Sequence, residues 1–279
     1  MAINSKTIMF GEYVKSQAAS YHALPDLDDF SADEDCIQAT IEVDVIPRLL
    51  AASRSIETEP ADARAEPADL DRFCTILLSD TVGHVNAYID RLIDRGISLD
   101  ALYLGHLAGA ARRLGVLWEE DAISLGEVSM GLMRMHQILR RLSPSFISDA
   151  PLDNDGRVAL FAVAPGETHA LGVVIMADFF TRAGWRTQVD INPKIEGLVT
   201  AVNETNASVV GISASATRFL PEVTSTIKAI RKATQDRRVL VLVGGNAFVE
   251  EPDAANRVGA DQFASDALEA LEAAGALKS

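Results

Sequence analysis

An acid and an imidazole stand two residues apart in a turn near the middle of the chain. The segment "FAVAPGETHALGVVIMADFF" contains an apolar run, a Pro-Gly turn, and then Glu167, His169 and Gly172 at the start of a second apolar run. A neutral imidazole beside a carboxylate is the arrangement of a metal ligand whose second ring nitrogen is held by a hydrogen bond. Ordinary polar turns also contain such residues, so their meaning depends on what else reaches this place.

The elements around this turn alternate between apolar strands and amphipathic helices from residue 157 onward. This alternation indicates a parallel sheet covered by helices on both faces. We expect a flavodoxin-like, doubly wound α/β fold with the first strand central. The predicted strands are 157–163, 186–191, 208–213, 238–245 and 261–263, and the predicted helices lie near 170–183, 194–204, 219–234, 249–257 and 266–274.

Several polar and small residues fall at the predicted carboxyl ends of neighbouring strands. Glu167 and His169 follow the first strand, Ser213 ends the third, and Gly244 and Gly245 end the fourth. Ligands of open parallel sheets bind at this edge, where the first and third strands diverge. Glycines there let a ligand approach the backbone closely. The sequence therefore predicts a ligand site at this rim.

Other ligands of such a rim leave sequence signatures that this chain lacks. A dinucleotide site would have G-x-G-x-x-G after a strand, and a P-loop would have G-x-x-x-x-G-K-[ST]. The segments "VAPGE" and "GISAS" also lack the acidic residues of a phosphoacceptor site. One histidine holds a free metal ion weakly, but it can complete the coordination of a metal that a macrocycle already holds.

A second region, residues 67–150, has a helical period as far as about Ser143. Ser98 is a predicted N-cap after Gly96. Ser124 and Glu127 match the capping-box pattern at the start of the next helix. The short connections between the predicted helices indicate an all-α antiparallel bundle.

The first region, residues 1–66, is acidic, with thirteen Asp and Glu against five Lys and Arg. We expect it to be partly helical, at Asp33–Arg54 with a bend at Pro47, or flexible. The whole chain carries a net charge of −15, which argues against direct DNA binding. Two cysteines, Cys36 and Cys74, and no long apolar segment suggest a cytoplasmic protein without a membrane span.

The C-terminal region, residues 155–279, resembles cobalamin-binding domains, whose motif runs D-x-H-x-x-G, then S-x-L, then G-G. The resemblance implies a cobalamin-binding fold with a histidine as the lower axial cobalt ligand, a hydrogen-bonded relay behind it, and glycines against the nucleotide tail. These roles fall on His169 as the metal ligand, on Glu167 and Ser213 as the relay, and on Gly172, Gly244 and Gly245 as the tail-binding surface. Glu167 replaces the Asp of the motif, and Ser215 stands in place of its Leu.

The helical region extends the likeness. "AARRLGVLWEEDAISLGEVSMG" resembles the cap that covers the other face of the corrin in light-responsive cobalamin regulators and in corrinoid proteins. The resemblance places Trp118 over the upper axial position. The photoreceptors of this group carry W-x9-E-H, whereas this chain has Val128 and Ser129 at the E-H positions. Trp118 could also be an ordinary core residue of the bundle.

Three features together resemble the AerR/PpaA regulators of bacterial photosynthesis genes. They are the amino-acid sequence of the helical region, the acidic N-terminal segment and the E-x-H variant. These regulators are cobalamin-binding antirepressors that act by contacting a repressor protein. The resemblance implies a non-enzymatic, light-responsive regulator with a corrinoid cofactor and a repressor partner. Two alternatives stay open: a corrinoid methyl-carrier subunit of a methyltransferase system, and a haem-binding redox sensor on the same fold.

Overall fold

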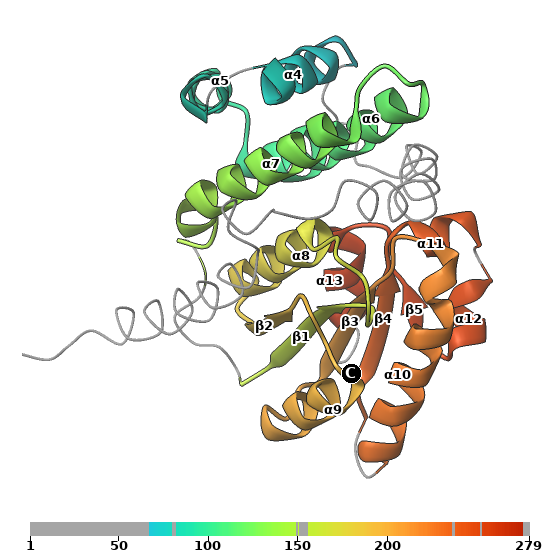
Figure 1. The fold of residues 1–279 in the computed structure, drawn as a ribbon. Helices are drawn as coiled ribbons and strands as arrows, with labels where there is room; N and C mark the ends of the chain where they lie inside the picture. The colour runs from blue at the N-terminus through green and yellow to red at the C-terminus, as the bar shows by residue number, and fades with distance from the viewer. Residues whose placement is uncertain are drawn as a thin grey trace, which may run out of the picture. The chain divides into compact units, whose positions relative to one another are not determined.

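The computed structural model describes residues 67–79, 82–148, 150, 156–235, 238–251 and 253–275. They belong to two compact units, a helical unit up to residue 148 and an α/β unit from residue 150 onward (Figure 1). The predicted helix Asp33–Arg54 and the rest of the acidic segment 1–66 lie outside the described residues. Among the described helices, none combines the length and apolar character needed to cross a membrane.

The α/β unit is built on five parallel strands in the order β2-β1-β3-β4-β5. This order confirms the flavodoxin-like prediction, with one adjustment: β1 is an interior strand, and β3 occupies the middle of the sheet. All five predicted strands are present, shortened by one to three residues. Their bounds are β1 Val158–Val163, β2 Arg186–Asp190, β3 Val209–Ser213, β4 Leu240–Gly244 and β5 Gln262–Phe263.

The register of the strands aligns three carboxyl ends along one edge of the sheet. Val163 of β1 pairs with Ser213 of β3, and Ser213 pairs in turn with Gly244 of β4. Because all strands run in one direction, the loops after β1, β3 and β4 leave the sheet side by side. This edge is the rim on which the candidate site is built.

Helices cover both faces of the sheet (Figure 1). Two of them, α8 (Leu171–Arg182) and α13 (Ala267–Gly275), pack with the side chains of one face. The other face is covered by α9 Ile195–Glu204, η4 Thr217–Phe219, α10 Leu220–Ala233, α11 Asn246–Glu250 and α12 Ala254–Val258.

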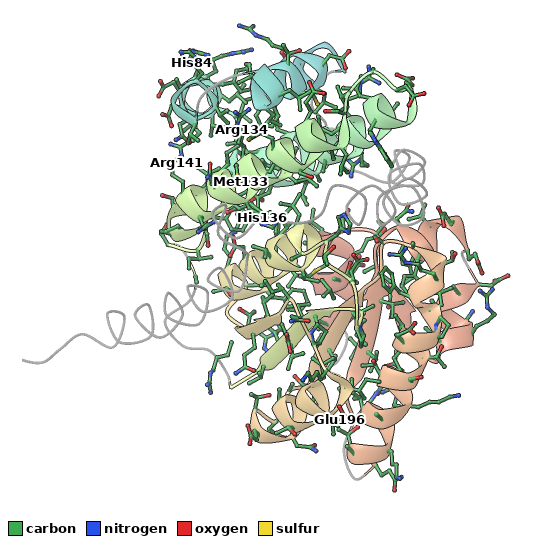
Figure 2. The ribbon with its side chains drawn as sticks, in the orientation of Figure 1. His84, Met133, Arg134, His136, Arg141 and Glu196 are labelled. Atoms are coloured by element: carbon green, nitrogen blue, oxygen red, sulfur yellow. The ribbon has the colours of Figure 1, made fainter. Side chains whose placement is uncertain are left out.

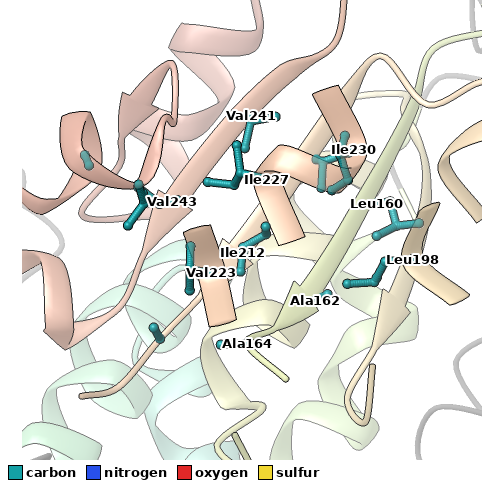
Figure 3. Close-up of a cluster of buried hydrophobic side chains, with 14 of the residues drawn as sticks. Leu160, Ala162, Ala164, Leu198, Ile212, Val223, Ile227, Ile230, Val241 and Val243 are labelled. Carbon is teal, nitrogen blue, oxygen red and sulfur yellow. The ribbon is translucent and has the colours of Figure 1, made fainter. Parts of the chain in front are cut away.

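In the core beneath α9 and α10, alternate residues of each strand point to opposite faces of the sheet. Leu160 and Ala162 of β1 point into this cluster, whereas Ala159 and Phe161 point to the opposite one. Such alternation is the period-two pattern of a strand with two buried faces. Figure 3 shows strand residues meeting Ile227 and other residues of α9 and α10. Each fully buried aliphatic side chain contributes about 1.5–3 kcal/mol to folding.

The predicted helix at 249–257 is wrong in detail, because two short helices occupy this segment. The first, α11, ends at Glu250, and α12 begins at Ala254. Glu251 is extended, with φ −124° and ψ 85°. The residue before a proline avoids the helical region, and Pro252 follows Glu251 in the sequence. The spacing of the apolar residues in the sequence does not indicate this break between the two helices.

The helical unit contains two further helices upstream of the predicted caps. They are α4 (Pro67–Ser79) and α5 (Val82–Asp94), followed by η3 Ala101–Leu107, α6 Ala108–Glu119 and α7 Leu125–Phe146. The N-cap prediction at Ser98 is confirmed, since its hydroxyl accepts a hydrogen bond from Ala101 N at 3.1 Å. The capping box of Ser124 and Glu127 is also confirmed.

The segment predicted as helical after Ser98 contains a seven-residue π-helix, η3, two residues from its start. The His106 ring, buried in this segment, has its Nδ1 3.3 Å from the carbonyl oxygen of Ala101, five residues earlier. The backbone N–H of Ala108 bonds to the carbonyl of Tyr103, five residues earlier, which is the hydrogen-bond spacing of the wider helix. Apolar spacing in the sequence does not separate it from an α-helix. Arg134 and Arg141 extend from α7 toward α4 and α5, where they bond to a carbonyl of α4 and a carboxylate of α5 (Figure 2).

Candidate functional site at the rim of the sheet

The turn after β1 delivers Glu167 to the rim. The carbonyl of Ala164 accepts a hydrogen bond from Glu167 N at 2.9 Å, so residues 164–167 form a β-turn. Pro165 and Gly166 occupy its central positions, and Gly166 has a φ of 84°. Proline first and glycine second, with positive φ at the glycine, is the pattern of a type II turn. The Pro-Gly dipeptide therefore fixes where the acid leaves the strand.

Glu167 is 3% exposed and its carboxylate accepts hydrogen bonds at both oxygens. Oε1 accepts from the backbone N–H groups of Thr168 and His169, at 2.7 and 3.0 Å. Oε2 accepts from Ser215 N at 3.0 Å and from the Ser215 hydroxyl. A buried carboxylate is tolerated only when such donors replace the water it has lost.

The imidazole of His169 is the next group along this hydrogen-bonded chain. Its Nδ1 lies 2.7 Å from Glu167 Oε1. An ionised carboxylate only accepts hydrogen bonds, so Nδ1 is the donor to Glu167 and the ring presents Nε2 on its other side. The side chain of His169 is 30% exposed, whereas that of Glu167 is 1% exposed. The histidine is thus tethered from the protein side and partly open, as a metal ligand must be.

The structure places Ser215 against Glu167, whereas the relay role predicted for Ser213 stays a prediction. The hydroxyl that donates to Glu167 belongs to Ser215, two residues beyond the end of β3. The physical reason is reach, because the glutamate side chain is one methylene longer than the aspartate of the resembled motif. The Ser213 hydroxyl lies instead beside Gly245, within 2.9 Å of where a Cβ would stand. Ser215 therefore makes the contact with Glu167 that the resemblance assigned to Ser213.

The three glycines of the predicted tail-binding surface differ in their surroundings. Gly245 has a φ of 88°, and a Cβ there would lie 2.5 Å from the carbonyl oxygen of Ala214. A Cβ on Gly244 would lie 3.1 Å from a backbone oxygen. The exposed Gly172, at the start of α8, has nothing within 4 Å of its Cβ position. Protein packing explains Gly245 by itself, and of the three glycines only Gly172 has open space at its Cβ position. The tail-binding role of all three stays a prediction.

Trp118 belongs to the helical unit and sits at the end of α6. It is 9% exposed and clusters with Val128, with Ile123 and Leu132 packed against the pair. This environment is that of a core aromatic residue, one of the two possibilities that the sequence left open. Its predicted role over the upper face of a cofactor stays a prediction.

Asn246 contacts the site but belongs to none of the sequence motifs. Asn246 follows the paired glycines, and its Nδ2 donates a hydrogen bond to the carbonyl of Ser215 at 3.2 Å. It thereby joins the loop after β4 to the serine of the relay. A lone asparagine after two glycines reads as a helix start, so only its contacts show where it lies in the network.

The donor set decides which kind of metal site fits. In the parts of the chain that the structure describes, no three His, Cys, Asp or Glu side chains gather as a metal cluster. A single imidazole suits a metal whose equatorial positions are filled by a macrocycle. The turn with His169 and the open backbone at Gly172 are compatible with such a group on this rim.

A doubly wound sheet with one tethered imidazole at its rim defines a domain suited to a metal macrocycle. Residues 157–274 match the family model described as B12 binding domain. The chain is also similar to dimethylamine corrinoid protein 2 of Methanosarcina mazei, with 28% identity over 166 residues, which cover 59% of this chain and 76% of that protein. These matches support cobalamin binding and leave the form of the cofactor unspecified.

Two further comparisons bear on the chain. It is 24% identical over 170 residues to an uncharacterized 20.5 kDa protein of the bchF-crtJ intergenic region in Rhodobacter capsulatus, covering 61% of this chain and 88% of that one. The solved Methanosarcina barkeri monomethylamine corrinoid protein superimposes with a TM-score of 0.65 at 18% identity, over 76% of this chain and all of that one. At this identity the second comparison shows the fold alone.

Proposed function

We propose that this chain is a cobalamin-binding regulator that changes its contact with a repressor protein when its cofactor responds to light. It is not an enzyme in this proposal. The single observation that supports it most is the Glu167–His169 bond, which engages Nδ1 and so leaves Nε2 as the nitrogen available for a metal, at the rim of a domain that matches the B12-binding model.

The residues of the rim have separate parts in holding the group. His169 Nε2 is the cobalt ligand, and Glu167 with Ser215 keeps the ring in the tautomer that can coordinate. Gly172 leaves room for the cofactor against the backbone of α8. When bound, an alkylcobalamin supplies a Co–C bond that light can break. The protein presents one imidazole nitrogen to it.

The regulatory part of the proposal is supported by sequence features both inside and outside the domain. The acidic segment 1–66 and the E-x-H variant are the features that resemble AerR/PpaA antirepressors. A similar protein comes from the bchF-crtJ intergenic region. The acidic charge suits binding to a basic protein surface rather than to nucleic acid.

A second function, that of a corrinoid methyl carrier, is favoured by a different observation. The Methanosarcina mazei relative is named as a dimethylamine corrinoid protein, and its similarity spans more of this chain than the B12-binding domain alone. A carrier would present the same histidine but would exchange methyl groups with partner methyltransferases. Haem is a second possible cofactor, since one histidine suits either macrocycle.

Absorbance titration separates the cofactors. We expect purified protein to shift the visible spectrum of hydroxocobalamin and to leave that of haem unchanged. His169→Ala should abolish the shift, whereas His84→Ala, on the exposed side of α5, should leave it intact (Figure 2). A shift with haem alone, or one that survives His169→Ala, would contradict the proposed ligand.

Illumination separates the regulator from the carrier. Protein loaded with methylcobalamin is kept dark or illuminated and then added to a repressor bound to its operator DNA. A regulator changes the amount of shifted DNA in one of these states, and His169→Ala removes the difference. Methyl transfer to a thiol by an added methyltransferase, with no effect of light on the repressor, would favour the carrier.

A further inference from the structure

Asn246 connects the loop after β4 to the serine that holds Glu167. It is 8% exposed and begins α11. Its Nδ2 donates to the Ser215 carbonyl at 3.2 Å and to Glu250 Oε1 at 3.3 Å. Glu250 is exposed, so the contacts of this amide run from the protein surface to the rim.

The orientation of this amide follows from its neighbours. The carbonyl of Ser215 and the carboxylate of Glu250 can only accept hydrogen bonds, so the nitrogen of the Asn246 amide must face them. The oxygen, Oδ1, then points elsewhere. Oδ1 is buried and has no hydrogen-bond partner among the residues that the structure describes.

The unsatisfied oxygen indicates what the side chain is kept for. A buried acceptor without a donor costs about 1–3 kcal/mol. A small apolar residue would avoid this cost while filling the start of α11. What the Asn246 side chain contributes therefore lies in the two hydrogen bonds of its nitrogen, to the Ser215 carbonyl and to Glu250.

Ser215 transmits the position of Asn246 to the metal ligand. Its carbonyl accepts from Asn246, while its N–H and hydroxyl both donate to Glu167. Glu167 in turn accepts from the Nδ1 of His169. The backbone supports the same contact, since Ala247 N donates to the carbonyl of Ala214 at 3.1 Å. One chain of hydrogen bonds thus crosses all three rim loops.

We propose that Asn246 is a positioning residue for His169, acting through Ser215 and Glu167 on the imidazole that ligates the cobalt. This inference rests on the proposed cobalamin site. Asn246 does not touch the metal. It holds Ser215 in the position from which Glu167 can orient the His169 ring. Through this contact, metal ligation is coupled to α11.

The test uses cobinamide, a corrinoid without its own nucleotide base. An axial nitrogen on the reduced, Co(II) form bound to the full chain must then come from the protein, and electron paramagnetic resonance detects it by its nitrogen splitting. The variants are Asn246→Asp, which is nearly isosteric but lacks the donor, and Asn246→Ala, which avoids a buried charge. Asn256→Asp and Asn256→Ala, on the exposed side of α12, are the matched controls.

We expect both Asn246 variants to lower the fraction of nitrogen-ligated cobalt and to raise the Kd for cobinamide, by about 2- to 10-fold for the alanine variant. The Asn256 variants should match the wild type, and circular dichroism should show all four folded. A loss of ligation by folded Asn246→Ala supports the proposal even if Asn246→Asp unfolds.

Two results would overturn it in different ways. If the wild type shows axial nitrogen that His169→Ala removes, and the Asn246 variants keep both the splitting and the Kd, then Asn246 has no positioning role. If the wild type shows no axial nitrogen at all, the proposed function fails and this inference fails with it.

Discussion

Glu167 holds Ser215 by two hydrogen bonds, one from the backbone N–H at 3.0 Å and one from the hydroxyl, across 48 residues of sequence. Both donors meet the same carboxylate oxygen, while the other oxygen accepts from the ring of His169. The pair thus joins the loops after β1 and β3. In the resembled motif an aspartate and a leucine stand at these positions, so the two departures from the motif contact each other.

The first prediction tests whether these two departures compensate. Glu167→Asp shortens the side chain by one methylene, and we expect it to lose the Ser215 hydroxyl and to weaken hydroxocobalamin binding about 10-fold or more. Glu167→Asp combined with Ser215→Leu restores the motif of the resembled family, with Ser213 next to the shorter acid. We expect the double variant to bind more tightly than Glu167→Asp alone, measured by absorbance titration.

The control for this experiment is Ser215→Leu alone, which leaves the long acid without its hydroxyl donor. It should bind at least as weakly as Glu167→Asp. Strictly additive losses in the double variant would show that the two positions act independently.

The second prediction separates the two serines. Ser215→Ala removes a hydrogen bond to a buried charged group and should lower the free energy of unfolding by about 1.5–3 kcal/mol. Ser213→Ala should lower the free energy of unfolding by less, because the hydroxyl that donates to Glu167 belongs to Ser215. Urea denaturation followed by circular dichroism measures both. If Ser213→Ala lowered the free energy of unfolding as much as Ser215→Ala or more, Ser215 would not be the serine that stabilises Glu167.

The third prediction concerns two glycines of the rim. Gly245→Ala forces a side chain into a backbone conformation almost reserved for glycine, against the carbonyl of Ala214, and should destabilise the fold by about 1–3 kcal/mol. Gly172→Ala meets open space in a helix and should leave stability unchanged or raise it by up to about 1 kcal/mol.

The Gly172→Ala substitution should affect corrinoid affinity and protein stability in opposite directions. If the cofactor lies against α8, Gly172→Ala weakens binding of hydroxocobalamin although the protein is at least as stable. Wild-type affinity in a stable Gly172→Ala protein would remove Gly172 from the binding surface. Thermal denaturation and absorbance titration of the same preparations provide both values.

The fourth prediction follows from His106 in the helical unit. Burial lowers the pKa of His106 below its ordinary value of 6.5, against a smaller opposing effect of the Ala101 carbonyl. The unfolded chain therefore takes up the proton more readily than the folded protein. The stability that the neutral ring provides is full above pH of about 6.5 and is lost as the pH falls through that value toward the lower folded pKa.

The measurement is the Tm of the wild type and of His106→Gln between pH 8 and pH 5. Glutamine keeps a donor and does not titrate, so the difference between the two proteins isolates the histidine from the many carboxylates. We expect the wild type to lose its advantage as the pH falls. A difference that is constant with pH would contradict a buried neutral His106.

Local chemistry was enough to predict much of the architecture. The interior strands β1, β3 and β4 carry continuous apolar runs because both of their faces are buried, and their alternation with helices indicates a parallel sheet. Ser98 and Ser124 were predictable as caps because a cap needs only one side-chain oxygen near the next backbone amides. The same reasoning missed the π-helix at 101–107 and the break after Glu250, where the hydrophobic spacing alone is ambiguous.

By itself, the sequence determined that Glu167 and His169 would stand together in a turn after the first strand, because the Pro-Gly dipeptide and two residues of spacing act within one loop. Only the tertiary structure decided that Ser215, rather than Ser213, donates to Glu167 and that Asn246 donates to the Ser215 carbonyl. The reason is geometric: these partners come from different strands, and which atoms meet depends on strand register and on the reach of one extra methylene.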